Sequence, residues 1–205
     1  MSIEEKNGSN VNLQRRKILT GATGVVGAVG ATFLAVPFVS SWQPSERAKA
    51  AGAPVNADIS QMQPGQMLTV EWRGKPVWIV RRTPDMLEGL APLEKELRDP
   101  ASDSSEQPEY CKNPSRAIEK EYLVVVGICT HLGCAPLYRP AIGSPDVGKD
   151  WQGGFFCPCH GSRFDLAGRV FQSVPAPTNL EIPPHHYLSD SLIRIGEDAK
   201  EQGAA

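Results

Sequence analysis

Two short segments decide the fold and the chemistry of this chain: Cys129-Thr130-His131-Leu132-Gly133-Cys134 and Cys157-Pro158-Cys159-His160-Gly161-Ser162. Each segment holds two cysteines and one histidine. Thiolate sulfur and imidazole nitrogen are the donors that zinc and iron–sulfur centres take from proteins. Together the segments can supply two sulfurs and two nitrogens to one metal centre, and one cysteine of each segment is then left over.

The pattern Cys129-x-His131-x-x-Cys134 with Cys157-x-Cys159-His160-x-Ser162 resembles the two boxes of a known family. It is similar to the Rieske iron–sulfur subunits of bacterial ubiquinol–cytochrome c reductases, the bc1 complexes. The resemblance extends to an apolar segment ahead of the boxes and to Pro175-Ala176-Pro177 after them. It implies a mainly β chain, an antiparallel β-sandwich with a small cluster-binding subdomain, preceded by one transmembrane helix and a flexible tether.

The resemblance also implies a role for each residue of the boxes. One [2Fe–2S] cluster is expected, with two cysteines on one iron and two histidines on the other, in place of two of the usual four cysteines. A disulfide between the remaining cysteines is expected to tie the two loops over the cluster. The expected ligands are Cys129, His131, Cys157 and His160; the disulfide is Cys134–Cys159; Ser162 donates a hydrogen bond to a cluster sulfur; and His160, with His131 second, contacts quinol.

Histidine ligation predicts a high reduction potential. Two ferric ions, two sulfides and two thiolates sum to zero charge, so the electron enters a neutral centre. Rieske centres accordingly work at roughly −150 to +300 mV, against about −400 mV for plant-type ferredoxins. Many relatives carry a tyrosine that bonds a ligand sulfur where this chain has Phe164. We therefore expect a potential below that of the tyrosine-bearing relatives.

Four other interpretations of the boxes stay open at this point. A Cys2His2 zinc site uses four ligands but leaves Cys134 and Cys159 without a role. Rieske centres of oxygenases and soluble ferredoxins normally lack those extra cysteines. The quinol–plastocyanin reductases usually have a smaller insertion than residues 82–121 before the first box. A Rieske subunit of a periplasmic oxidase, such as arsenite oxidase, shares the boxes but needs no permanent membrane span.

The N-terminal part predicts a membrane anchor. Residues 18–39 carry no charge over 22 positions, enough at ~1.5 Å per residue to cross a ~30 Å hydrocarbon layer. A cleaved signal peptide is the alternative, but its apolar region is usually shorter. Arg15-Arg16-Lys17 precede the span, so residues 1–17 are expected in the cytoplasm and the rest beyond a bacterial inner membrane, in the periplasm. The arginine pair also resembles a twin-arginine export signal.

Composition divides the remaining chain into a tether and one domain. The net charge of −2 gives no reason to expect nucleic-acid binding. Residues 40–57 are rich in small residues and prolines and are expected to form a flexible tether. Residues 58–205 are expected to form the Rieske domain, with the cluster-binding subdomain at about 128–178. Strands are predicted at 67–72, 76–81, 122–128, 154–157 and 191–195, a hairpin turn at 73–75 and one helix at 85–97.

Three further side chains are expected to have no role in the centre. Cys111 lies in a polar stretch beside Pro114 and is expected to be a free surface thiol. His185 and His186 follow two prolines and are expected to face solvent. The partners that the resemblance implies are ubiquinol, cytochrome b, cytochrome c1 and membrane lipid. The implied reaction takes one electron and a proton from ubiquinol and passes the electron to cytochrome c1.

Overall fold

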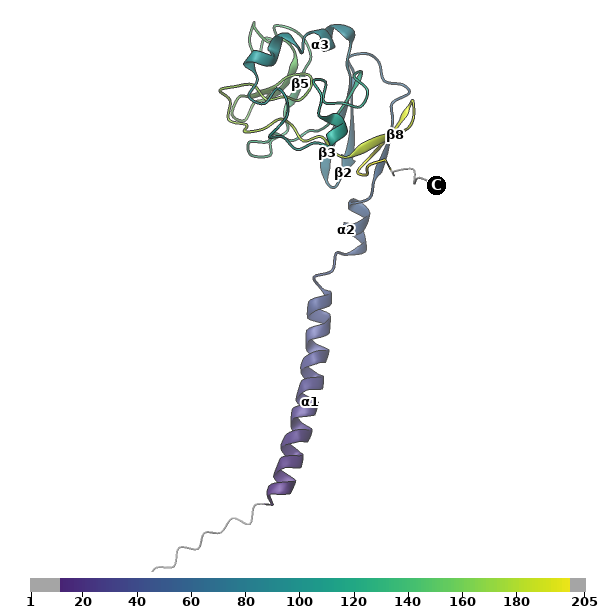
Figure 1. Ribbon diagram of the computed structural model, residues 1–205, viewed down its shortest axis with the longest axis vertical. Helices are drawn as coiled ribbons and strands as arrows, with labels where there is room; N and C mark the ends of the chain where they lie inside the picture. Colours follow the sequence, from purple (N-terminus) through teal and green to yellow (C-terminus); the bar gives the residue numbers. More distant parts are fainter. Residues whose placement is uncertain (1–11, 200–205) are drawn as a thin grey trace, which may run out of the picture. The chain divides into compact units, whose positions relative to one another are not determined.

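The structure is a computed structural model that describes residues 12–199. It divides into two units, and the main element of the first is one long helix (Figure 1). Helix α1 spans Leu13–Ser40, and the Asn12 side chain caps it by accepting a 3.0 Å hydrogen bond from the backbone N–H of Arg15. Threonine hydroxyls donate to carbonyl oxygens one turn back, at Thr20, Thr23 and Thr32. The helix therefore presents few free polar groups, as a lipid environment requires. The expected segment 1–17 lies largely outside the described residues, as do positions 200–205 of the domain.

The segment expected as a flexible tether contains two regular elements. Helix α2 spans Glu46–Ala51, and strand β1, Val55–Asp58, begins before residue 57. The flexibility of residues 40–57 stays a prediction. A short helix fits Glu46 and Lys49, which form an ion pair one turn apart.

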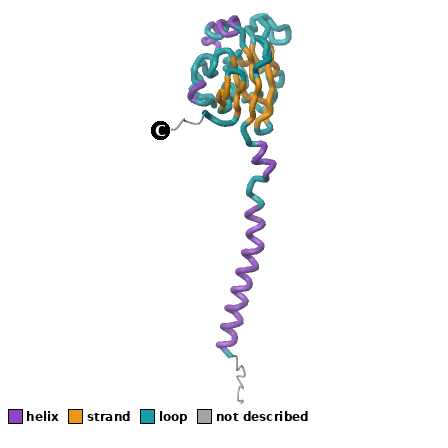
Figure 2. The backbone as a smooth tube through the Cα atoms, turned by 90° about the vertical axis from the view of Figure 1, so that its right-hand side faces the viewer, coloured by secondary structure: helices purple, strands orange, loops and turns teal. Residues whose placement is uncertain are grey.

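The second unit is built from three antiparallel sheets of three strands each, which Figure 2 shows gathered into one domain. Their orders are β1–β9–β8, β2–β3–β4 and β5–β6–β7. The remaining strands are β2 Met67–Trp72, β3 Lys75–Arg81, β4 Tyr122–Val126, β5 Leu137–Arg139, β6 Gly154–Cys157, β7 Ser162–Phe164, β8 His185–Ser189 and β9 Leu192–Ile195.

The middle sheet, β2–β3–β4, contributes to two cores because side chains alternate across a strand. On β3, Val77 and Ile79 pack with the residues of β1 and β9, whereas Trp78 and Val80 pack with those of β6 and β7. The ring of Trp78 stacks on that of Phe155, with centroids 5.3 Å apart. A strand buried on both faces has no polar alternation, which explains the apolar run Leu123–Val126 on β4.

Several predicted elements agree with the structure, and one does not. Strands 67–72 and 154–157 have the predicted bounds, and Arg73 and Gly74 form the hairpin turn with φ of 53° and 71°. The single helix predicted at 85–97 was wrong. It is divided into helix α3, Pro84–Glu88, and the 3₁₀ helix η1, Pro92–Glu96. Gly89 ends the first piece, and Pro92 lacks the N–H that would continue it.

Two expectations about exposure were wrong. The Cys111 thiol is fully buried, at the end of the 3₁₀ helix η2, Glu109–Cys111. His185 is 1% exposed, and its Nδ1 lies 2.8 Å from the carbonyl oxygen of Pro183. His186 is partly buried as well. Tyr110 covers His185 edge-on and binds its backbone N–H, a contact across 75 residues that no local pattern reveals.

Candidate metal centre

The two cysteine–histidine segments lie at the ends of strands in the third sheet. The first segment runs between β4 and β5, and the second forms the turn between β6 and β7. Each loop is closed by backbone hydrogen bonds: the N–H of Gly133 donates to the Cys129 carbonyl, and the N–H of Gly161 donates to the Cys157 carbonyl, both at 3.0 Å. Both glycines have positive φ, which a side chain would strain. The tight turns therefore place a cysteine and a histidine close together in each loop.

The four expected ligands divide into a buried pair and a more exposed pair. Cys129 and Cys157 are both buried, whereas His131 is partly buried and His160 is exposed. The two imidazole rings lie edge to face, with centroids 4.7 Å apart. Each loop thus contributes one thiol and one imidazole, and the like groups of the two loops lie next to each other. This arrangement matches a centre whose sulfur-bound iron is inside and whose nitrogen-bound iron is near the surface.

The electrostatics of the buried thiols favour a metal centre. Burial raises the pKa of the Cys129 thiol, the adjacent Cys157 thiol raises it further, and a hydrogen bond from Ser162 lowers it. Two adjacent buried thiolates are costly without a cation, and bound iron supplies the compensating charge. Two thiols and two imidazoles are also the donor set that a Rieske [2Fe–2S] centre needs. The residues present therefore fit the cluster.

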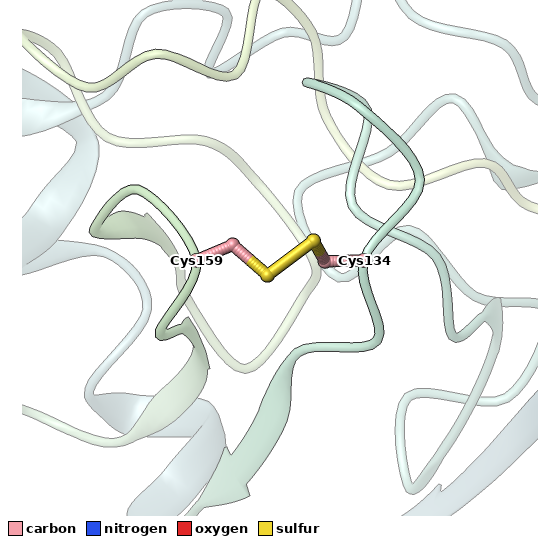
Figure 3. Close-up of a disulfide and its surroundings, with 2 residues drawn as sticks. All are labelled: Cys134 and Cys159. Carbon is pink, nitrogen blue, oxygen red and sulfur yellow. A yellow bond between two sulfur atoms is a disulfide. The ribbon is translucent and has the colours of Figure 1, made fainter.

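The remaining pair of cysteines forms a disulfide between the loops. Figure 3 shows Cys134 and Cys159 joined across the gap between their two loops, with Cα atoms 6.8 Å apart. Their sulfurs and that of Cys157 lie within 4.8 Å of one another. Because two of these three sulfurs are bonded to each other, the group is no three-thiolate site. The disulfide instead holds both loops in place beside the ligands.

A third loop, the proline loop at 175–177, is tied to both cysteine–histidine loops. The Thr130 hydroxyl donates a 2.7 Å hydrogen bond to the carbonyl oxygen of Thr178. The Ser162 hydroxyl accepts a 3.0 Å bond from the N–H of Ala176. No sequence pattern indicates this contact of Thr130, apart from the position of the residue inside the first box. Leu132, 72% exposed and next to His131 in the sequence, and the exposed Pro175 and Pro177 give these joined loops an apolar rim.

The chain enters the proline loop through a residue other than glycine that takes a left-handed conformation. Ser173 takes a left-handed conformation here, with φ of 58°. The Arg98 guanidinium donates a 2.9 Å bond to the Val174 carbonyl oxygen, and Gln172 binds the Leu97 carbonyl at 2.9 Å. These contacts from the η1 region offset the strain that a non-glycine residue incurs.

Comparison with known proteins assigns the family. Residues 53–184 match the family model described as "Rieske [2Fe-2S] domain", and residues 6–45 match "Ubiquitinol-cytochrome C reductase Fe-S subunit TAT signal". The ubiquinol–cytochrome c reductase iron–sulfur subunit of Allochromatium vinosum is 62% identical over 192 residues, covering 94% of this chain and 93% of the relative. This chain belongs to the Rieske iron–sulfur subunits of bacterial ubiquinol–cytochrome c reductase. The corresponding subunit of Bradyrhizobium diazoefficiens is 42% identical and covers 89% of this chain and 94% of its own.

Membership in the Rieske subunits decides among the interpretations that the boxes left open. The cofactor is a [2Fe–2S] cluster, so the zinc interpretation is set aside, and the curated relatives are reductase subunits and not oxidase subunits. A chain from the solved structure "Hyperthermophilic respiratory Complex III" is 29% identical, covers 86% of this chain and 98% of its own, and has a TM-score of 0.46. Helix α1 is long and apolar enough to cross a membrane, which fits the single-pass anchor of such a subunit.

Proposed function

We propose that Cys129, His131, Cys157 and His160 hold the [2Fe–2S] cluster of this reductase subunit. The observation that carries the proposal is the meeting of two buried thiols and two perpendicular imidazoles from two loops that a disulfide joins. When bound, the cluster supplies a one-electron acceptor of high potential. The Ser162 hydroxyl, next to the Cys129 thiol, donates a hydrogen bond toward a cluster sulfur.

The second part of the proposal concerns the proton. The His160 imidazole is the exposed member of the pair, so it is the ring that a quinol hydroxyl reaches first, with the partly buried His131 second. Its outer ring nitrogen accepts the hydrogen bond from ubiquinol and then holds the proton. Iron at the other ring nitrogen would leave this outer nitrogen as the one free to accept the proton. The same nitrogen releases the proton after the electron has left for cytochrome c1.

The apolar rim around the histidines orients this exchange. Leu132, Pro175 and Pro177 are exposed on loops that are bonded to one another, and an apolar rim excludes water when it is covered. We propose that the rim docks at the quinol-oxidation site of cytochrome b and afterwards at cytochrome c1. Both surfaces belong to the complex of which this chain is a subunit.

The proposed topology assigns each part of the chain to one side of the bacterial inner membrane. Residues 1–17 lie in the cytoplasm with the twin-arginine signal, 18–39 cross the lipid, 40–57 form the tether, and 58–205 form the Rieske domain in the periplasm, with the cluster-binding part at about 128–178. The three basic residues 15–17 before the span support this orientation. Gly52 and Pro54, which follow α2, leave room for movement of the domain between its two partners.

Low-temperature electron paramagnetic resonance of isolated membranes tests the proposal. After reduction with ascorbate we expect a rhombic Rieske signal, shifted by an inhibitor of the quinol-oxidation site. The variants Cys157→Ala and His131→Ala are expected to lose the signal, whereas Cys111→Ala keeps it. A signal that ignores the inhibitor would contradict docking at cytochrome b. Retention of the unaltered signal in Cys157→Ala would contradict the ligand assignment.

A further inference from the structure

Four charged side chains are buried together behind the second cysteine–histidine loop. The exposed fractions are 1% for Arg82 and 0% for Arg116, Arg169 and Asp165. Over residues 12–199, Asp165 is the one carboxylate buried to this degree. Three positive charges therefore face one negative charge in the interior of the domain.

All four groups surround the backbone at residues 165–169. Arg82 Nη1 donates to the Leu166 carbonyl oxygen at 3.0 Å, and Arg116 Nη1 donates to the Ala167 and Gly168 carbonyl oxygens at 3.2 Å. Arg169 Nε lies 2.7 Å from Asp165 Oδ2. Burial lowers the pKa of Arg82 and of Arg116 to about 10, so both stay protonated at neutral pH.

Neutral carbonyl groups accept most of the hydrogen bonds that Arg82 and Arg116 donate, so these bonds leave the positive charges uncompensated. The same chain binds partly buried carbonyl groups with neutral amides: Asn113 Nδ2 donates to the Ala117 carbonyl oxygen and Asn179 Nδ2 to the Asp99 carbonyl oxygen, both at 2.9 Å. Arg169 Nη1, in contrast, is buried without a partner among the described residues. Burying a guanidinium costs far more than burying an amide. The three arginines therefore leave a net positive charge beside the single buried carboxylate.

The stretch of chain that the charged groups surround continues directly from a strand paired with a proposed ligand. Ser162 pairs with Cys157 across strands β7 and β6, and Asp165 follows Ser162 by three residues, about 10 Å along an extended chain. Phe164, between them in the sequence, is fully buried, so this stretch of chain runs through the interior of the domain. Water screens such a charge much less than a surface charge.

We propose that Arg82, Arg116 and Arg169 raise the reduction potential of the centre through their excess positive charge, a role that rests on the proposed ligation by Cys129 and Cys157. Reduction adds a negative charge to the centre, and a net positive charge nearby favours the reduced form. For one unit charge at about 15 Å and an effective dielectric constant of about 20, the reduction equilibrium shifts about sixfold. That factor is about 45 mV for a one-electron couple.

A redox titration of membranes that carry the full chain, followed by the Rieske resonance, tests this role. Arg82→Gln and Arg116→Gln are expected to lower the midpoint potential by about this amount, and Asp165→Asn is expected to raise it. Lys120→Gln is the matched control: Lys120 is exposed, and its carbonyl oxygen accepts a 2.6 Å bond from Arg82. It removes the same charge from a solvated site and is expected to leave the potential unchanged.

The opposite signs separate charge from structural damage. Loosening of the fold moves all the interior variants in one direction, whereas the proposal requires Asp165→Asn to move against the arginine variants. Shifts in one direction, or no shift at all, overturn the proposal. If one variant fails to assemble, the remaining arginine variant and Asp165→Asn decide the sign. Absence of the resonance in the unaltered chain would instead contradict the proposed ligation, so the two failures are distinguishable.

Discussion

The hydroxyl of Thr130 binds the carbonyl oxygen of Thr178 at 2.7 Å, which joins two loops that lie 48 residues apart in the sequence. Two further links are the bond from the N–H of Ala176 to the Ser162 hydroxyl and the disulfide Cys134–Cys159. Together the three links join the two cysteine–histidine loops and the proline loop into one unit. A shift of any one loop would break a bond to another. The histidines are therefore positioned by contacts from outside their own loops.

Thr130→Val removes this bond while keeping the shape of the side chain. We expect the free energy of unfolding to fall by about 1 kcal/mol, the usual net value of a hydrogen bond. Urea unfolding of the detergent-solubilised chain measures it. Thr69→Val, on the exposed face of strand β2, is the control and is expected to change stability little. Equal effects of the two substitutions would contradict the importance of the bond.

The disulfide Cys134–Cys159 closes a loop of the chain. Replacing both cysteines with alanine opens this loop. The two residues are 25 apart, and the chain-entropy model gives about 3–4 kcal/mol for a loop of this length. We expect the midpoint of urea unfolding to fall accordingly, and the Rieske resonance to broaden as the loops gain freedom. Dithiothreitol is expected to have the same effect on the unaltered chain and none on the variant. A variant as stable as the unaltered chain would contradict this prediction.

Stability is expected to depend on pH through His185. Burial lowers the pKa of this histidine below its ordinary value of 6.5, so the unfolded chain binds the proton more readily than the folded one. The contribution is present above about pH 6.5 and is lost as the pH falls toward the folded-state pKa. His185→Phe keeps an aromatic ring against Tyr110 but does not titrate. Its unfolding free energy, measured between pH 5 and pH 7.5, is expected to fall less on acidification; parallel curves for the two chains would refute the assignment.

Phe164→Tyr restores the hydroxyl that many relatives place at this position. Phe164 is fully buried in the core that also contains Cys129 and Cys157, so a new hydroxyl has a ligand sulfur as its natural acceptor. A hydrogen bond to a ligand sulfur stabilises the reduced centre, and the midpoint potential is expected to rise. Protein-film voltammetry measures the change. An unchanged potential, with the cluster retained, would show that the hydroxyl does not reach the sulfur.

Sequence patterns predicted the elements that carry their own signal. Strand β2 alternates and is bounded by the Arg73-Gly74 turn, so its limits could be read directly. Strands β5 and β7 have three residues each, too few to show a period, and were missed. Apolar residues recur at helical spacing over 85–97, but Pro92 lacks the backbone N–H that a continuous helix needs, so the helix is interrupted there.

In the functional site, too, local motifs could be predicted from the sequence and long-range contacts could not. The two boxes are local motifs, and they led to all of the proposed ligands and to the disulfide that the structure contains. Burial of Cys111 and His185 depends on residues such as Tyr110 that lie far away in the sequence, so local polarity gave the wrong answer. The bond between Thr130 and Thr178 is likewise a product of tertiary folding.

The pairing of strand β1 with strand β9 sets an order of events during biosynthesis. Val55 to Asp58, the first strand of the domain, pair with Ile195 to Leu192, the last. The ribosome therefore makes the whole domain before β1 can meet its hydrogen-bond partner. Closure of this sheet is a late step of folding, and it suits a chain whose N-terminal segment matches a family described as a TAT signal.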